Sequence, residues 1–189
     1  MADASRLKVA FIGSHGVGKT TLCYGLAARL KARDVALEMV HEVARRCPLP
    51  INEATSLASQ SWILHTQIAE EVVAQARYPV VICDRSALDN YVYMILAAGR
   101  QKALEGLMET WLESYNLLVL VPVTDEPMAD GFRTTDPEFQ RLVEDRVCSE
   151  IDERGLTALR LDTRRRGEWL DVVEREVLER LGSRQLRLL

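Results

Sequence analysis

The sequence predicts an α/β protein in which a parallel sheet is covered by helices on both faces. Short, mainly apolar segments alternate along the chain with longer stretches of helical character, and this alternation is typical of parallel strands buried on both faces. A second observation is the Walker A sequence Gly13–Thr20, a complete match to the phosphate-loop pattern G-x-x-x-x-G-K-[ST]. It stands between an apolar run, Leu7–Ile12, and a helical pattern, Thr21–Leu30. Together these features predict a P-loop NTPase three-layer sandwich around a five-stranded parallel sheet.

The elements follow from local patterns. Five mainly apolar runs are expected to form the strands: Leu7–Ile12, Val35–Val40, Val80–Cys83, Leu117–Val121 and Leu156–Leu161. After Thr21–Leu30, helices are expected at Glu53–Gln75, Ser86–Ala98, Gln101–Glu113, from Thr135 onward, and at Trp169–Leu181. Asn52 is a candidate N-cap, Pro137 suits a first helical turn, and Gly182 is a stop signal. We therefore expect one P-loop domain over residues 1–182 and a C-terminal tail over 183–189.

Composition favours a single domain without a strongly charged partner. With 189 residues, 48% of them hydrophobic, the chain can bury a core. Its net charge of −4 gives no overall attraction to nucleic acid or to an anionic membrane. The four cysteines form no C-x-x-C pair, which argues against a zinc site or a disulfide framework. Since no segment has the pattern of a membrane span or a signal peptide, we expect a cytoplasmic protein without membrane or nucleic-acid partners, either a monomer or a homodimer.

The phosphate loop indicates nucleotide binding. Its glycines allow the backbone to curl so that successive N–H groups point at phosphate oxygens, and the N-terminus of the following helix adds positive potential. We expect Lys19 to reach the β- and γ-phosphates and the Thr20 hydroxyl to bind Mg²⁺. ATP and Mg²⁺ are therefore the expected cofactors. The residues expected to hold the nucleotide at this loop are Gly13, Ser14, His15, Gly16, Val17, Gly18, Lys19, Thr20 and Thr21.

Charged residues also follow other strands, and ligands of such a sheet bind beyond the carboxyl ends of the strands. Asp84 ends an apolar run, so it is a candidate Mg²⁺ partner or the N-cap of the next helix, a role that Ser86 fits equally well. Arg85 follows it and can contact a phosphate or form a salt bridge. Glu42 follows the second strand, where it can accept a proton from a substrate hydroxyl or begin a helix.

Three further segments are expected at or near the carboxyl ends of the strands. Arg133 ends a long loop that is either a lid closing on the γ-phosphate or a surface loop with an incidental Arg. Arg164 and Arg165 follow the last strand, where they can stack on the nucleotide base or form a solvated turn. Three polar residues of the long second helix either line an acceptor pocket or form a solvated stripe: Gln60, Gln67 and Glu71.

Five segments taken together resemble one family of small P-loop proteins: Gly13–Thr20, Glu42–Cys47, the helix with Gln60 and Gln67, Cys83–Ser86 with Asp89–Tyr91, and Asp130–Asp136. This family is often labelled an AAA-type ATPase domain, and it includes the ribosylnicotinamide kinase domain of the bacterial NAD-biosynthesis regulator. The layout is also similar to that of deoxynucleoside and thymidylate kinases. The resemblance implies that Glu42 is the general base, Asp84 the metal partner, Arg85 the arginine on the acceptor side and Arg133 the lid arginine. The single lid arginine departs from the several that deoxynucleoside kinases usually carry.

Two classes of function stay open at this point. The first is an ATP-Mg²⁺-dependent kinase that phosphorylates a small nucleoside-like or nucleotide metabolite. The second is a nucleotide-dependent switch or NTPase that acts on a protein partner. None of the asparagines precedes a lysine, so the guanine-reading motif N-K-x-D of small GTPases is absent from the sequence.

Overall fold

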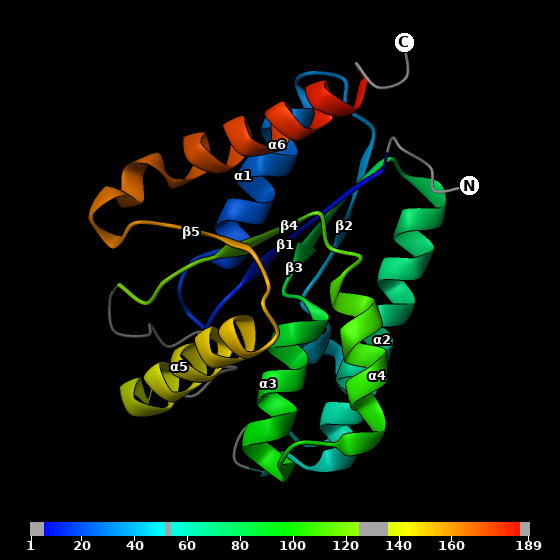
Figure 1. Cartoon of the computed structure of the whole chain (residues 1–189), viewed down its shortest axis with the longest axis vertical. Helices are drawn as coiled ribbons and strands as arrows, with labels where there is room; N and C mark the ends of the chain where they lie inside the picture. The colour runs from blue at the N-terminus through cyan, green and yellow to red at the C-terminus, as the bar shows by residue number, and fades with distance from the viewer. Residues whose placement is uncertain (1–5, 52–53, 125–135, 186–189) are drawn as a thin grey trace.

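The computed structural model describes residues 6–51, 54–124 and 136–185. A parallel sheet with the strand order β2-β3-β1-β4-β5 crosses the middle of the molecule (Figure 1). This confirms the predicted five-stranded parallel sheet. The strands are β1 (Leu7–Ile12), β2 (Leu37–Val40), β3 (Val80–Asp84), β4 (Leu117–Leu120) and β5 (Ala158–Arg160).

Helices cover both faces of the sheet. One face carries α1 (Lys19–Lys31) and α6 (Trp169–Gln185) (Figure 1). The other face carries four helices: α2 (Leu57–Arg77), α3 (Ala87–Ala98), α4 (Lys102–Leu112) and α5 (Pro137–Glu153). Two short 3-10 helices, η1 (Val43–Arg46) and η3 (Thr163–Glu168), follow β2 and β5.

The two helical layers explain why the strands are apolar throughout. Successive side chains of a strand point to opposite faces. In β1, Val9 and Phe11 therefore pack in the core beneath α1 and α6, while Ala10 and Ile12 pack in the core shared with α2, α3 and α5. All four side chains are fully buried. A strand buried on both faces loses the alternation of apolar and polar residues that a surface sheet would show.

The start of α2 differs from the prediction. Ser56, not Asn52, is its N-cap: the Ser56 side chain accepts a hydrogen bond from the Ser59 N–H, and the Ser59 hydroxyl accepts one from the Ser56 N–H. This reciprocal pair fixes the first turn and moves the start of the helix from Glu53 to Leu57. The prediction for α5 is confirmed, because Asp136 caps this helix and Pro137 lies in its first turn.

The ends of several other elements also differ from the prediction. Strand β2 begins at Leu37 instead of Val35, because α1 ends in a tight turn in which Asp34 has a φ of 59°. Strand β5 is limited to Ala158–Arg160. The stop signal at Gly182 is wrong, since α6 continues to Gln185. A single exposed glycine only weakens a helix that packs along its length, and α6 packs on α1.

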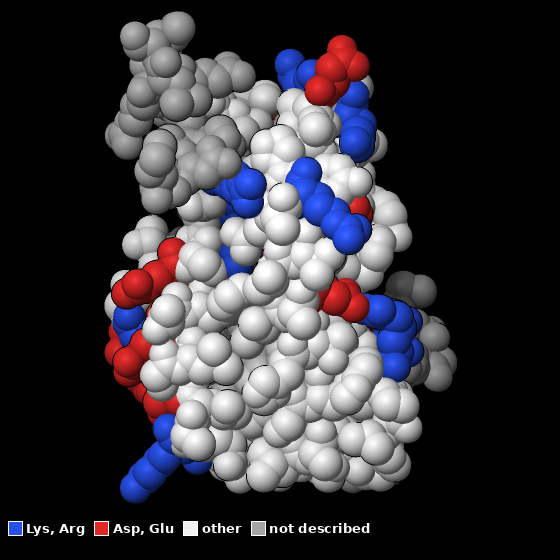
Figure 2. All heavy atoms as spheres, turned by 90° about the vertical axis from the view of Figure 1, so that its right-hand side faces the viewer, with Lys and Arg blue, Asp and Glu red and all other residues white. Residues whose placement is uncertain are grey.

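The face formed by α2 and α4 carries few charged side chains over its lower half (Figure 2). Helix α2 exposes Val72 and Val73 to solvent. Among the described residues, no helix has the length and apolar character needed to cross a membrane. All four cysteines are free thiols.

Candidate active site

The phosphate loop connects β1 to α1 and approaches the end of β4 so closely that only glycine fits at its first position. Gly13 has a φ of 130°, and a Cβ atom placed there would lie 2.5 Å from the carbonyl oxygen of Val121. Gly18, with a φ of 92°, is the N-cap of α1. These left-handed conformations are easily adopted by glycine and strain other residues. The loop therefore has the backbone curvature that a phosphate cradle requires.

Lys19 is turned inward at the centre of this loop. Its side chain is only 4% exposed, and its Nζ donates hydrogen bonds to the carbonyl oxygens of Gly13, at 3.0 Å, and Ser14. An ammonium group held inside a ring of backbone groups is placed to bind an anion that enters the loop.

Asp84 faces the phosphate loop, and not the helix that follows it. Its Oδ2 accepts a 2.6 Å hydrogen bond from the Thr20 hydroxyl. The cap of α3 is Ser86, whose side chain accepts from the N–H groups of Leu88 and Asp89. The alternative in which Asp84 caps the helix is therefore wrong.

The Thr20–Asp84 pair fits the chemistry of a Mg²⁺ site. Mg²⁺ prefers oxygen ligands and is usually held by one or two protein groups together with phosphates and water. One hydroxyl and one carboxylate in direct contact meet this requirement. Among the described residues, no three His, Cys, Asp or Glu side chains gather into a metal site. A metal ion bound here would take its remaining ligands from phosphates and water.

Glu42 and Arg85 form a buried ion pair at the ends of β2 and β3. The Nε of Arg85 donates to Oε1 of Glu42 at 2.8 Å, and the Nε of Arg45 donates to Oε2 at 2.9 Å. Glu42 and Arg85 are 5% and 4% exposed. Burial opposes the charge on Arg85, but Tyr93 and Glu42 beside it raise its pKa, so the guanidinium stays protonated. The two arginines thus hold the Glu42 carboxylate through both of its oxygens.

Arg85 has an unusual backbone conformation. Its φ of 87° lies in the left-handed region, which a residue with a side chain rarely adopts. Such residues are concentrated at functional sites, where the surrounding structure enforces the strain. The N–H of Arg85 donates to the carbonyl oxygen of Phe11, so the turn after β3 is tied to the end of β1 next to the phosphate loop.

Helices α3 and α5 also contact the phosphate loop, through Asp89, which belonged to the family resemblance but was given no role, and through Gln140, which sequence reasoning missed. Asp89 of α3 accepts the Gly13 N–H at 2.8 Å and, through its other oxygen, the N–H and hydroxyl of Ser86. Gln140 of α5 donates to the carbonyl oxygen of His15 at 2.8 Å. The S-x-x-D spacing of a capping box was a usable signal for Asp89. No local pattern indicated Gln140, because its contact joins residues 125 positions apart.

Tyr93 of α3 joins the two halves of the site. Its hydroxyl lies 3.3 Å from Nδ1 of His15 in the phosphate loop, and its ring lies 5.1 Å from the guanidinium carbon of Arg85. The ion pair and the loop therefore belong to one continuous cluster.

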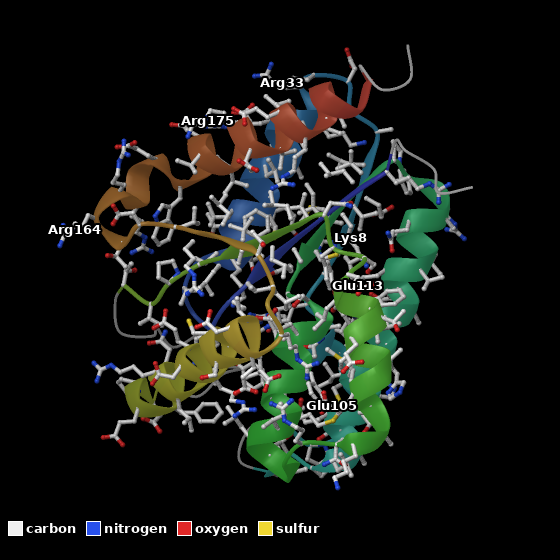
Figure 3. The ribbon with its side chains drawn as sticks, viewed as in Figure 1. Lys8, Arg33, Glu105, Glu113, Arg164 and Arg175 are labelled. Carbon is white, nitrogen blue, oxygen red and sulfur yellow. The ribbon has the colours of Figure 1, made fainter. Side chains whose placement is uncertain are left out.

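The remaining predicted residues are less closely connected to this cluster. Arg133 lies outside the described residues, so its lid role stays a prediction. Arg164 points outward from η3 (Figure 3), and Arg165 pairs with Glu168. Their predicted contact with the nucleotide base also stays untested. The three polar residues of α2 are buried, with exposed fractions of 6% or less, so the solvated stripe is wrong: Gln60, Gln67 and Glu71.

Comparisons with known proteins identify the family and the fold of the chain. A family model described as an AAA domain matches residues 8–168. A thymidylate kinase of Polaromonas sp. (strain JS666 / ATCC BAA-500) is 25% identical over 157 residues, and the match covers 77% of this chain and 67% of the relative.

Two solved structures have the same fold. The crystal structure of NadR protein in complex with NR has a TM-score of 0.72 at 23% identity and is matched over 94% of this chain and 52% of that one. The chain thus spans about half the length of that NadR chain. The structure of deoxyadenosine kinase from M. mycoides, with the products dCMP and a flexible dCDP bound, has a TM-score of 0.66 at 11% identity, over 92% of this chain and 100% of that one.

Proposed function

The chain belongs to the AAA domain family, and we propose that it is a P-loop small-molecule kinase. In this proposal the chain acts as one kinase-like domain in the cytoplasm, and this domain includes α6 as far as Gln185. The donor is ATP with Mg²⁺, and the acceptor is a hydroxyl or phosphate group of a nucleoside-like or nucleotide metabolite. The Polaromonas relative is a thymidylate kinase and the M. mycoides structure is a deoxyadenosine kinase, which supports this class of acceptor.

The observation that carries the proposal is the Glu42–Arg85 ion pair beside the phosphate loop. A protein that only binds nucleotide needs the loop, Lys19 and the Thr20–Asp84 pair. It has no need for a second buried carboxylate, held through both oxygens by arginines and linked to the loop through Tyr93. A kinase that phosphorylates a hydroxyl does need one, to receive the proton of that hydroxyl.

Each group has a role in the proposed transfer. Lys19 and the loop N–H groups bind the β- and γ-phosphates, and Arg133 closes on the γ-phosphate from the lid. Thr20 and Asp84 hold the Mg²⁺, which when bound offsets phosphate charge. The acceptor oxygen forms a bond to the γ-phosphorus as the bond to the β,γ-bridging oxygen breaks, and ADP leaves. Where the acceptor is a hydroxyl, Glu42 takes its proton, while Arg85 orients Glu42 and faces the acceptor. Arg164 and Arg165 are proposed to hold the base.

The test is ADP release from ATP-Mg²⁺ in the presence of a panel of nucleosides, nucleoside monophosphates and ribosylnicotinamide. Lys19→Ala serves as the blank. We expect one compound to stimulate ADP release strongly and to yield a phosphorylated product detectable by mass. Slow turnover that no panel compound changes would contradict a kinase and favour a nucleotide-dependent switch that acts on a protein.

A further inference from the structure

A buried ion pair lies beneath the active site. Lys8 of β1 and Glu71 of α2 are both completely buried, and their Nζ and Oε2 atoms are 2.9 Å apart. Lys8 lies on the side of the sheet that faces α2 and α4 (Figure 3), with its Nζ 4.3 Å from the ring centroid of Trp111 and 4.2 Å from that of Tyr115. A buried ion pair contributes little to stability on balance, because removing two charges from water is costly. Its contacts indicate instead that it orders the side chains around it.

The Glu71 carboxylate accepts hydrogen bonds from four side chains. Lys8 and the indole N–H of Trp111 donate to Oε2, both at 2.9 Å. Nε2 of Gln67, at 2.9 Å, and the hydroxyl of Tyr115, at 2.7 Å, donate to Oε1. A carboxylate with two partners on each oxygen fixes the position and direction of every donor around it.

Two of these donors continue to the turn that carries Arg85. The Tyr115 hydroxyl accepts a 2.8 Å hydrogen bond from the N–H of Ala87. Gln67 Nε2 also donates a hydrogen bond to the carbonyl oxygen of Arg85, at 3.4 Å. The strained residue is thus held on its C-terminal side by two side chains, both of which are fixed by Glu71.

We propose that Tyr115 and Gln67, fixed by the Lys8–Glu71 pair, are positioning residues for Arg85 in the reaction; this inference rests on the kinase function proposed above. A non-glycine residue keeps a left-handed φ only where its surroundings enforce it. Loosening either contact lets the turn relax, and the Arg85 side chain then moves away from Glu42 and the acceptor. Neither Tyr115 nor Gln67 needs to contact a substrate for this effect.

The molecule offers a matched pair of variants for the test. Tyr115→Phe removes a hydroxyl that bridges a glutamate and a backbone N–H. Tyr91→Phe removes a buried hydroxyl with the same kinds of partner: it donates to Glu105 at 2.6 Å and accepts from the Gln101 N–H at 3.1 Å. That second bridge joins α3 to α4 and has no contact with the Arg85 turn among the described residues. It therefore controls for the loss of a buried hydroxyl as such.

Three measurements define the expected result. With the panel compound that stimulates ADP release most, kcat/KM for that compound is expected to fall about tenfold or more in Tyr115→Phe, since an error of 1 Å in placing a reacting group costs about a hundredfold. The Kd for ATP is expected to stay within about twofold of the wild-type value. Without any ligand, hydrogen exchange at the Ala87 amide, followed by NMR, is expected to accelerate. Tyr91→Phe is expected to change none of the three by more than about twofold.

A double-mutant cycle separates positioning from general destabilisation. In an Arg85→Lys background, Tyr115→Phe is expected to cost less than about twofold in kcat/KM, because its effect acts through Arg85. A full and additive loss in that background, or an equal loss in Tyr91→Phe, would overturn the inference. If Tyr115→Phe does not fold, Gln67→Met removes the other contact to the turn and is judged by the same cycle.

The exchange measurement distinguishes failure of this inference from failure of the proposed function. If no panel compound is phosphorylated by the wild-type protein, the kinase proposal fails, and faster exchange at Ala87 in Tyr115→Phe alone still supports the restraint on the turn. If the wild-type protein is an active kinase and Ala87 exchange does not change, the positioning role is refuted.

Discussion

Replacing Lys8 by methionine tests how strongly the buried charge of Glu71 depends on its partner. Methionine keeps the length and the apolar stem of lysine but cannot donate a hydrogen bond. Both side chains of the pair have no exposed surface, and Lys8 is the only cation that contacts Glu71 among the described residues. The substitution therefore leaves a buried carboxylate with three neutral donors in place of an ion pair.

The expected loss follows from this geometry. Removing one partner of a buried ion pair destabilises a protein by about 3–5 kcal/mol. For a chain of this size each kcal/mol corresponds to about 2–4 °C in Tm, so Tm is expected to fall by roughly 6–20 °C. Lys8→Met combined with Glu71→Gln removes both charges and is expected to recover about 1–2 kcal/mol relative to the single variant.

Denaturation in guanidinium chloride, followed by tryptophan fluorescence, measures these differences, and Trp111 reports directly because it donates to Glu71. Lys31→Met is the control, since Lys31 is exposed on α1 and exposed substitutions usually change stability by no more than about 0.5 kcal/mol. A loss below about 1 kcal/mol in Lys8→Met, or a loss as large in Lys31→Met, would refute this reasoning.

Three further predictions concern the phosphate loop and the Glu42–Arg85 ion pair of the active site. Lys19→Ala is expected to lower kcat for ADP release by a factor of about 100 or more while the circular dichroism spectrum is unchanged; an unchanged kcat would refute the phosphate-loop assignment. Glu42→Gln is expected to lower kcat about 100-fold or more with little change in the Kd for ATP; lost ATP binding with intact kcat would assign Glu42 a metal or structural role. Gly13→Ala is expected to lower stability by about 1–3 kcal/mol and to abolish ATP binding, because the added Cβ would meet the Val121 carbonyl oxygen at 2.5 Å. Normal ATP binding by a fully stable Gly13→Ala protein would contradict that close approach.

The features that were predicted well from the sequence depend on residues that are close together in the chain. The apolar runs identified the strands of the sheet, and the Walker A pattern located the loop that holds Lys19. We expected the ends of the strands to share one edge of the sheet. At that edge the structure has Asp84 next to Thr20 and Arg85 next to Glu42. Helix starts were less certain, because several polar residues before α2 had the chemistry of an N-cap and only the backbone geometry selected Ser56.

The hydrogen bonds around the Glu71 carboxylate could not be predicted from the sequence, for a physical reason. Lys8 lies in an expected buried strand, and Glu71 was expected either to line a pocket or to be solvated; neither pattern indicates a pairing, although such charged residues are almost never fully buried unless they are paired. Their pairing becomes visible only when β1, α2 and α4 are packed together, because the four donors to Glu71 come from positions 8, 67, 111 and 115. The strain at Arg85 was hidden for the same reason: nothing in the sequence Cys83–Ser86 requires a left-handed φ, and the restraints on the C-terminal side of Arg85 come from Tyr115 and Gln67. Residues with an expected chemical role at a strand end were therefore predictable, whereas the residues that hold Arg85 in place depend on the tertiary fold.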